Sequence, residues 1–257
     1  MERRRRPKIN SEKTSSDFQL NNVNSCTVEG NLLDWEIQPT RQYFSQNNMH
    51  RVKIDPINHL KIMDLIDSDD GYTITKCNIE FNEFSRVIVP SYVDGKKITG
   101  IGTYAFVKDS RDDIDRMPIL SGDLNIKSVV IPEGIRFIAD HVFCRCRNMW
   151  NIVLPNSLEF ILDGCFYDTG LYQIKIPENV FYLGDYLFSG GSPYTFETYS
   201  STIEPLVSRI LLPNSLTYIG DKSFRRCRSK FYVDDGSYAY YFAKSHGYTI
   251  CKSSDFK

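Results

Sequence analysis

Residues 128–147 read SVVIPEGIRFIADHVFCRCR, and this stretch decides the fold because its pattern returns along the chain. Residues 151–166 read NIVLPNSLEFILDGCF, and residues 210–227 read ILLPNSLTYIGDKSFRRC. In each stretch an apolar run closes at a proline, and a phenylalanine follows 11 residues after that proline. Self-similarity at a fixed period is the sequence signature of a repeat architecture. We therefore predict a stack of similar units.

The repeat is anchored by five prolines, which are Pro90, Pro132, Pro155, Pro177 and Pro213. Apolar residues recur six, three and one residues before each proline. This alternation is the period of a strand with one buried face, and proline suits the end of such a strand because it donates no ladder hydrogen bond. The shortest intervals between prolines are 22 and 23 residues, and longer intervals hold insertions at 107–125 and 189–206. Since one unit cannot bury its apolar side alone, we predict a solenoid.

The quoted stretches resemble the leucine-rich repeats of BspA-like proteins, which run through an apolar strand, a proline, a Ser-Leu pair, Ile-Gly and Ala-Phe. The resemblance extends over residues 71–250. It implies a repeat solenoid of the leucine-rich-repeat type, mostly β with short helical corners and a C-terminal capping helix, and it implies a role in recognition. Local signals agree with the cap, because Ser237 suits the N-cap of a helix over residues 238–246 and Gly247 suits its left-handed end.

The rest of the chain divides by composition. Residues 1–25 carry the run Arg3–Arg6 and few large apolar groups, so we predict a disordered, basic and polar tail. Residues 26–70 contain scattered apolar residues of weak periodicity, and we interpret them as an N-terminal segment or cap. The array with its C-terminal cap then occupies residues 71–250, and residues 251–257 form a short tail.

Charge and targeting signals restrict the partner and the compartment. The chain has 31 Lys and Arg against 32 Asp and Glu, so its overall field does not favour nucleic acid, and a protein partner is expected. The start MERRRRPKIN lacks the following apolar stretch of about 7–15 residues that a signal peptide has. With no run of about 18 apolar residues and with seven cysteines, the sequence predicts a cytoplasmic, intracellular protein with reduced thiols and no membrane span. A cell-surface or secreted adhesion protein is the alternative.

Side chains that could carry chemistry are better explained by packing. An aspartate stands three residues before four of the repeat phenylalanines: Asp140, Asp163, Asp185 and Asp221. We expect each to accept hydrogen bonds from backbone N–H groups two or three residues further on, rather than to bind calcium. Four cysteines gather near the same phenylalanines and are predicted to be buried: Cys144, Cys146, Cys165 and Cys227. We therefore predict no enzyme, no metal and no cofactor, with an enzyme of unknown type as a third possibility.

An aromatic column is the first candidate binding surface. An aromatic residue stands five residues after four of the prolines: Phe137, Phe160, Tyr182 and Tyr218. The next residue in each repeat belongs to a predicted core column, and adjacent residues of an extended segment point to opposite faces. We therefore expect these rings to face outward as an apolar stripe that holds a protein partner. The competing interpretation is that the rings stack on one another or lie beneath the insertions.

A strand column is the second candidate. Two residues before each proline, on the outward side of the main strand, stand Ile88, Val130, Val153, Lys175 and Leu211. This column is apolar for a face in contact with solvent, and the neighbouring outward positions are polar, which together give the mixed surface typical of recognition. The sequence therefore predicts a non-catalytic module for protein–protein interaction through a solenoid surface.

Overall fold

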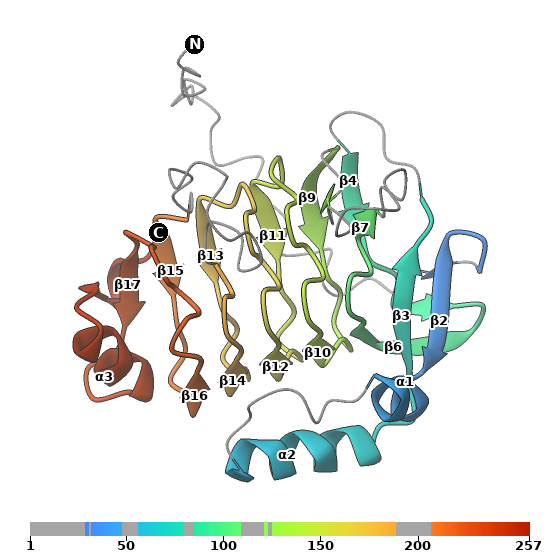
Figure 1. The fold of residues 1–257 in the computed structure, drawn as a ribbon, viewed down its shortest axis with the longest axis horizontal. Coiled ribbons are helices and arrows are strands. Elements are labelled where there is room, and N and C mark those ends of the chain that lie inside the picture. Colours follow the sequence, from blue (N-terminus) through green and yellow to red (C-terminus); the bar gives the residue numbers. More distant parts are fainter. Residues whose placement is uncertain are drawn as a thin grey trace, which may run out of the picture.

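In the described part of the chain, flattened coils lie side by side in a stack (Figure 1). The computed structural model describes residues 29–30, 32–47, 56–79, 85–108, 121–122, 125–188 and 207–257. The predicted tail at 1–25 and the insertion at 189–206 lie outside these residues, as does most of the insertion at 107–125.

Each repeat supplies a main strand that ends before its proline. Three of these strands form one parallel sheet: β4 (Ser85–Ile88), β9 (Ile126–Val130) and β11 (Asn151–Val153). A second parallel sheet joins two more of them, β13 (Gln173–Lys175) and β15 (Arg209–Leu211), to β17 (Lys230–Val233) and β18 (Thr249–Lys252), which no repeat proline follows. Equivalent positions of successive repeats lie opposite one another, as Val129 and Ile152 do. The predicted repeat register is confirmed.

A second, shorter strand follows each proline. These strands pair in parallel in the order β10 (Phe137–Ile138), β12 (Phe160–Ile161), β14 (Tyr182–Leu183) and β16 (Tyr218–Ile219). The same sheet continues toward the N-terminal side through β6 (Lys96–Ile101), β5 (Tyr92–Val93), β3 (Tyr72–Cys77), β2 (Trp35–Pro39) and β1 (Glu29–Gly30). A separate hairpin joins β7 (Val107–Lys108) and β8 (Ser121–Gly122).

The main core lies between the main strands and the second strands, and a file of phenylalanines runs through it. Successive rings stack at centroid distances of 5.0 to 6.0 Å: Phe106, Phe143, Phe166, Phe188 and Phe224. Each of these rings is buried. The file continues without a break between Phe188 and Phe224, although 36 residues separate them. The repeat phenylalanines are therefore the shared axis of the coils.

The C-terminal end of the core is closed by α3 (Tyr238–Ser245), as predicted. The Ser237 hydroxyl accepts a hydrogen bond from the N–H of Tyr240, and Gly247 has a φ of 71° beyond the helix. The ring of Phe242 packs against Phe224 at 6.1 Å. After the helix, β18 adds a last strand to the sheet, and a 3-10 helix (Ser253–Asp255) follows it, so the ordered fold reaches past residue 250.

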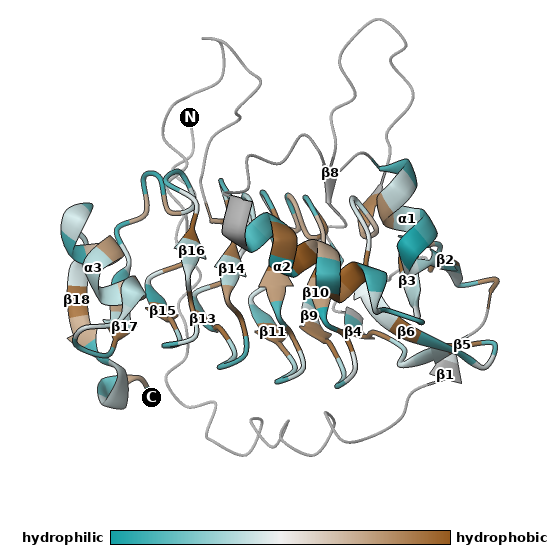
Figure 2. Cartoon of the chain, turned by 90° about the horizontal axis from the view of Figure 1, so that it is seen from below, coloured by the Kyte–Doolittle hydropathy of each residue, from teal (hydrophilic) through white to brown (hydrophobic). Residues whose placement is uncertain are grey.

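The N-terminal segment forms two helices, α1 (Thr40–Gln46) and α2 (Pro56–Asp67). Viewed from below, α2 lies across the row of second strands (Figure 2). Its Ile62 and Ile66 side chains belong to one apolar cluster with rings from those strands. No helix in the described ranges has the length and apolarity that a bilayer span requires.

Removing a ring from the phenylalanine file should destabilise the whole array. Phe166 is 1% exposed and stacks on both neighbours, so we expect Phe166→Ala to lower the free energy of unfolding by about 3–5 kcal/mol, because the change leaves a cavity between two coils. Denaturant unfolding followed by circular dichroism measures the loss. Tyr241→Ala, at an exposed aromatic on α3, serves as the control and should change stability little. Equal losses in the two variants would contradict the role of the file.

Candidate interaction surface

The predicted aromatic column is not exposed. Phe137, Phe160 and Tyr182 are each 1% exposed, and Tyr218 is half-buried. The rings do point away from the main core, as the alternation predicted, and they stack in pairs, Phe137 on Phe160 at 5.4 Å and Tyr182 on Tyr218 at 4.8 Å. A second apolar cluster covers them, and it contains Tyr43, Phe44, Ile62, Ile66 and Phe181. The prediction of an exposed stripe is therefore wrong.

The cover comes from the N-terminal helices. Ile62 and Ile66 lie one turn apart on α2 and are both buried against the column, whereas Leu60 on the same helix is 65% exposed. From α1, Phe44 packs against Phe137 at 4.8 Å. The Lys61 ammonium lies 3.6 Å from the centroid of the Phe181 ring. The N-terminal segment of the chain thus covers the aromatic column.

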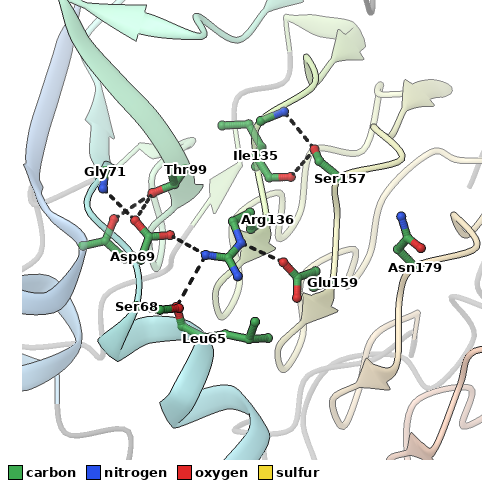
Figure 3. Close-up of polar contacts among 12 residues, drawn as sticks. Leu65, Ser68, Asp69, Gly71, Thr99, Ile135, Arg136, Ser157, Glu159 and Asn179 are labelled. Carbon is green, nitrogen blue, oxygen red and sulfur yellow. Dashed lines mark hydrogen bonds and ion pairs between the residues drawn. The ribbon is translucent and has the colours of Figure 1, made fainter.

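Polar contacts fix both ends of α2. Beyond its C-terminal end, the buried Asp69 carboxylate accepts hydrogen bonds from the N–H of Gly71 and the hydroxyl of Thr99, and it forms an ion pair with Arg136 at 3.3 Å (Figure 3). Arg136 also binds Glu159 of the next coil at 2.7 Å. Near its N-terminal end, the hydroxyl of Thr217 donates to the Asn58 side-chain oxygen at 2.9 Å. The helix is therefore held to coils at both ends of the array.

The predicted strand column is exposed in part. Ile88 is 37% exposed, Lys175 is exposed, and Val153 and Leu211 are half-buried, so these four side chains reach the surface of the main sheets. Val130 is an exception, since it is fully buried. It stands on the central strand β9 with Ile88 and Val153 directly opposite on the two flanking strands.

Two exposed aromatic residues stand beside this column. Trp150 is 57% exposed and Tyr172 is 52% exposed, and each immediately precedes its main strand, five residues before a proline. The Trp150 N–H donates to the Lys127 carbonyl on one neighbouring coil, and the Tyr172 carbonyl accepts from the N–H of Ser208 on another. The sequence analysis missed both residues. The available signal was a large aromatic at one outward position in two consecutive repeats.

The aspartate ladder joins coils rather than capping its own turn. The Asp140 carboxylate accepts from the N–H of Asp163 at 2.9 Å, Asp163 from Asp185 at 2.8 Å, and Asp185 from Lys222 at 3.1 Å. The predicted donors, two or three residues further along the same coil, are therefore wrong. A glycine on the next coil makes room for two of these carboxylates, because a Cβ at Gly184 or Gly220 would overlap the aspartate oxygen.

Family comparison agrees with this architecture. The family model for the BspA-type leucine-rich repeat region matches residues 119–233 in six copies. Residues 119–233 are a BspA-type leucine-rich repeat region. The BspA-type repeats make this a repeat protein of the interaction or adhesion type. Among curated proteins, none matches the chain.

Solved structures similar to this chain are themselves leucine-rich repeat proteins or bacterial antigens. One is a leucine-rich repeat protein of T. pallidum, with 25% identity and a TM-score of 0.49 over 64% of this chain and 64% of that one. Another is the pneumococcal vaccine antigen PcpA, with 22% identity and a TM-score of 0.43 over 64% of this chain and 46% of that one. This chain spans less than two thirds of either protein.

Burial governs the titratable groups inside the BspA-type repeats. Desolvation raises the pKa of the Cys144 thiol to about 11 and that of Cys227 to about 12, so both remain protonated thiols at neutral pH. A catalytic cysteine needs the opposite change, a lowered pKa. Desolvation also raises the pKa of Asp140 to about 6 and that of Asp163 to about 7. Within the described ranges, no group of three His, Cys, Asp or Glu side chains is arranged to hold a metal ion.

Substitutions on α2 test whether this helix covers the aromatic column. Ile62 is fully buried, so Ile62→Ala should lower the free energy of unfolding by about 2–4 kcal/mol, because the change opens a cavity above the buried rings. Leu60→Ala, on the exposed side of the same helix, is the matched control and should cost less than about 0.5 kcal/mol. Chemical denaturation of both variants measures the difference. If both behave like the parent protein, α2 does not cover the column in solution.

The raised pKa of Asp163 predicts a pH dependence of stability. In the unfolded chain this carboxyl ionises near its usual pKa of 3.8, whereas in the folded protein its pKa is about 7. Between these values the folded protein holds more protons than the unfolded chain, so stability falls as pH rises from about 4 to about 7. Asp163→Asn keeps an oxygen acceptor for Asp185 but cannot ionise. We expect the variant to gain on the order of 1–3 kcal/mol relative to the parent protein across this window.

Thermal and denaturant unfolding at several pH values give the two stability curves. Asp221→Asn is the control, because Asp221 is exposed at the equivalent place in the last repeat, and its curve should run parallel to that of the parent. A parallel curve for Asp163→Asn as well would show that this carboxyl is solvated in the folded protein.

Proposed function

We propose that this protein is a non-catalytic binding module that holds a protein partner on the outer face of its main strands. The observation that carries the proposal is the pair of exposed aromatic residues, Trp150 and Tyr172, on the coils of β11 and β13. The exposed part of the strand column, Ile88, Val153, Lys175 and Leu211, lies on the same sheets and extends the surface.

Large aromatic side chains in water leave apolar area unburied, and tryptophan and tyrosine are the residues most enriched at binding hot spots. Here the backbone next to both residues is fixed by hydrogen bonds to neighbouring coils. A partner therefore meets a surface that is already ordered, and binding requires little further loss of conformational entropy.

A non-catalytic role is supported by the state of the reactive groups. The cysteines at the repeat corners are buried with raised pKa values, and the carboxylates of Asp140, Asp163 and Asp185 accept backbone hydrogen bonds between coils. These groups hold the coils together. They do not converge on an open cleft in the described part of the chain, whereas Trp150 and Tyr172 face solvent.

Replacing the aromatic pair should remove binding without unfolding the protein. Trp150→Ser with Tyr172→Ser should reduce the amount of partner recovered from source cells by at least about tenfold, the effect of losing about 1.4 kcal/mol. Quantitative mass spectrometry of proteins captured by the full chain measures this. The matched control is Tyr238→Ser with Tyr241→Ser, which removes two exposed aromatics from α3 and should leave recovery unchanged. Undiminished capture by the folded Trp150 and Tyr172 variant would rule out this surface.

A further inference from the structure

The charges on the main strands have one sign. Five main strands end before a repeat proline, and β17 continues their sheet. None of the six contains Asp or Glu: β4, β9, β11, β13, β15 and β17. Their charged residues are all basic: Arg86, Lys127, Lys175, Arg209 and Lys230. The whole chain is nearly balanced, with 31 basic against 32 acidic residues. The positive charge of the main strands is therefore a local property of this face.

The fold does not neutralise this charge. Within the described part of the chain, Arg86, Lys175 and Lys230 are exposed and form no ion pair. Arg209 and Lys230 stand directly opposite each other on β15 and β17. Like charges in directly opposed positions of adjacent strands destabilise a sheet. The guanidinium of Arg209 donates hydrogen bonds to Gln173 and to the Lys257 carbonyl oxygen, whereas the exposed Lys230 beside it has no ion pair within the described residues.

One of these cations is also held in a defined place. The Arg209 guanidinium lies 5.0 Å from the ring centroid of Tyr232 and 5.1 Å from that of Phe256, and its Nε donates to the Tyr232 hydroxyl at 3.1 Å. A guanidinium fixed in this way loses little freedom when a carboxylate binds it, and Arg–carboxylate hydrogen bonds are among the stronger ones in proteins.

We propose that the outer face of the main strands binds an acidic polypeptide segment in which carboxylates alternate with large apolar side chains. This inference rests on the proposed function and names the partner class of the same surface. Carboxylates would meet the basic positions on β13, β15 and β17, and apolar side chains would meet Trp150, Tyr172 and the exposed part of the strand column.

A polypeptide suits this face better than a nucleic acid does. Each strand brings no more than one charged residue, and apolar side chains such as Val153 and Leu211 lie between the charged ones. A nucleic acid carries a phosphate at every nucleotide and is bound chiefly through dense positive charge. An alternating acidic and apolar peptide matches both kinds of side chain.

Selection from a displayed library of random peptides on the full chain tests the proposal. We expect the recovered peptides to be enriched in Asp and Glu together with Leu, Phe or Trp. Synthetic peptides from the selection, labelled for fluorescence anisotropy, should bind more weakly as salt rises from about 50 to about 500 mM, because screening weakens attraction between exposed charges. Lys175→Glu with Lys230→Glu should weaken binding at least about tenfold.

A control with the same change in net charge separates the effect of the main-strand cations from the effect of net charge alone. Lys97→Glu with Arg225→Glu reverses two exposed charges outside the main strands and should change the dissociation constant by less than about twofold. Circular dichroism confirms that all variants are folded. The variant Trp150→Ser with Tyr172→Ser, measured on the same peptides, reports the proposed function separately from the charge.

Each outcome decides one of the two proposals. Peptides without acidic enrichment that still require Trp150 and Tyr172 would overturn the acidic partner and leave the proposed function standing. Peptides that bind independently of Trp150 and Tyr172, or no recovered peptide at all, would overturn both. Tighter binding of an oligothymidylate than of the selected peptides, lost in the Lys175 and Lys230 variant, would assign the face to a nucleic acid and overturn the inference.

Discussion

Stacking of one phenylalanine on the next is the contact on which the other features of this structure depend. A ring centroid spacing of 5.0 to 6.0 Å, repeated from Phe106 to Phe224, is close to the spacing of paired strands. The file therefore sets the rise from coil to coil. With that rise and register fixed, every other column must also repeat, including Asp140 under Asp163 and Phe137 beside Phe160. The position of each residue is therefore set by the equivalent residue of the neighbouring coil.

This constraint explains why the molecule has two different faces. On the second strands, the position just before the core column is aromatic in four coils, which leaves more apolar surface than the main core can use. The N-terminal helices cover it, with Ile62 and Ile66 of α2 above the rings. On the main strands, four of the five residues of the strand column reach the surface, and Trp150 and Tyr172 beside them are exposed. Within the described residues, the face with these exposed side chains is also the one that carries the local positive charge.

The repeat could be predicted from the sequence because its residues satisfy one another at short, regular distances. The proline anchors, the buried column at Val129 and Ile174, and the cap at Ser237 all follow from local pattern and appear where expected. The burial of Phe160 could not be predicted in this way. Its cover comes from Ile62, about 100 residues earlier, in a helix whose amphipathic pattern is weak, and nothing in the repeat itself specifies a partner at that distance. The hydrogen-bond donors to the aspartates were predicted wrongly for a similar reason. The N–H group that Asp140 accepts from belongs to Asp163 on the next coil, and the sequence of one coil does not indicate which residue of the next coil lies beside it.

The attachment of α2 at both ends changes how this stack can come apart. In a simple solenoid each coil touches only its neighbours, so terminal coils can fray while the middle persists. Here one rigid rod connects the coil of Arg136 to the coil of Thr217, through Asp69 at one end and Asn58 at the other. If the coil of Arg136 or that of Thr217 unfolds, α2 must bend or detach from the coils between them. We expect the coils from Arg136 to Thr217 to unfold more cooperatively than contacts between nearest neighbours alone would make them.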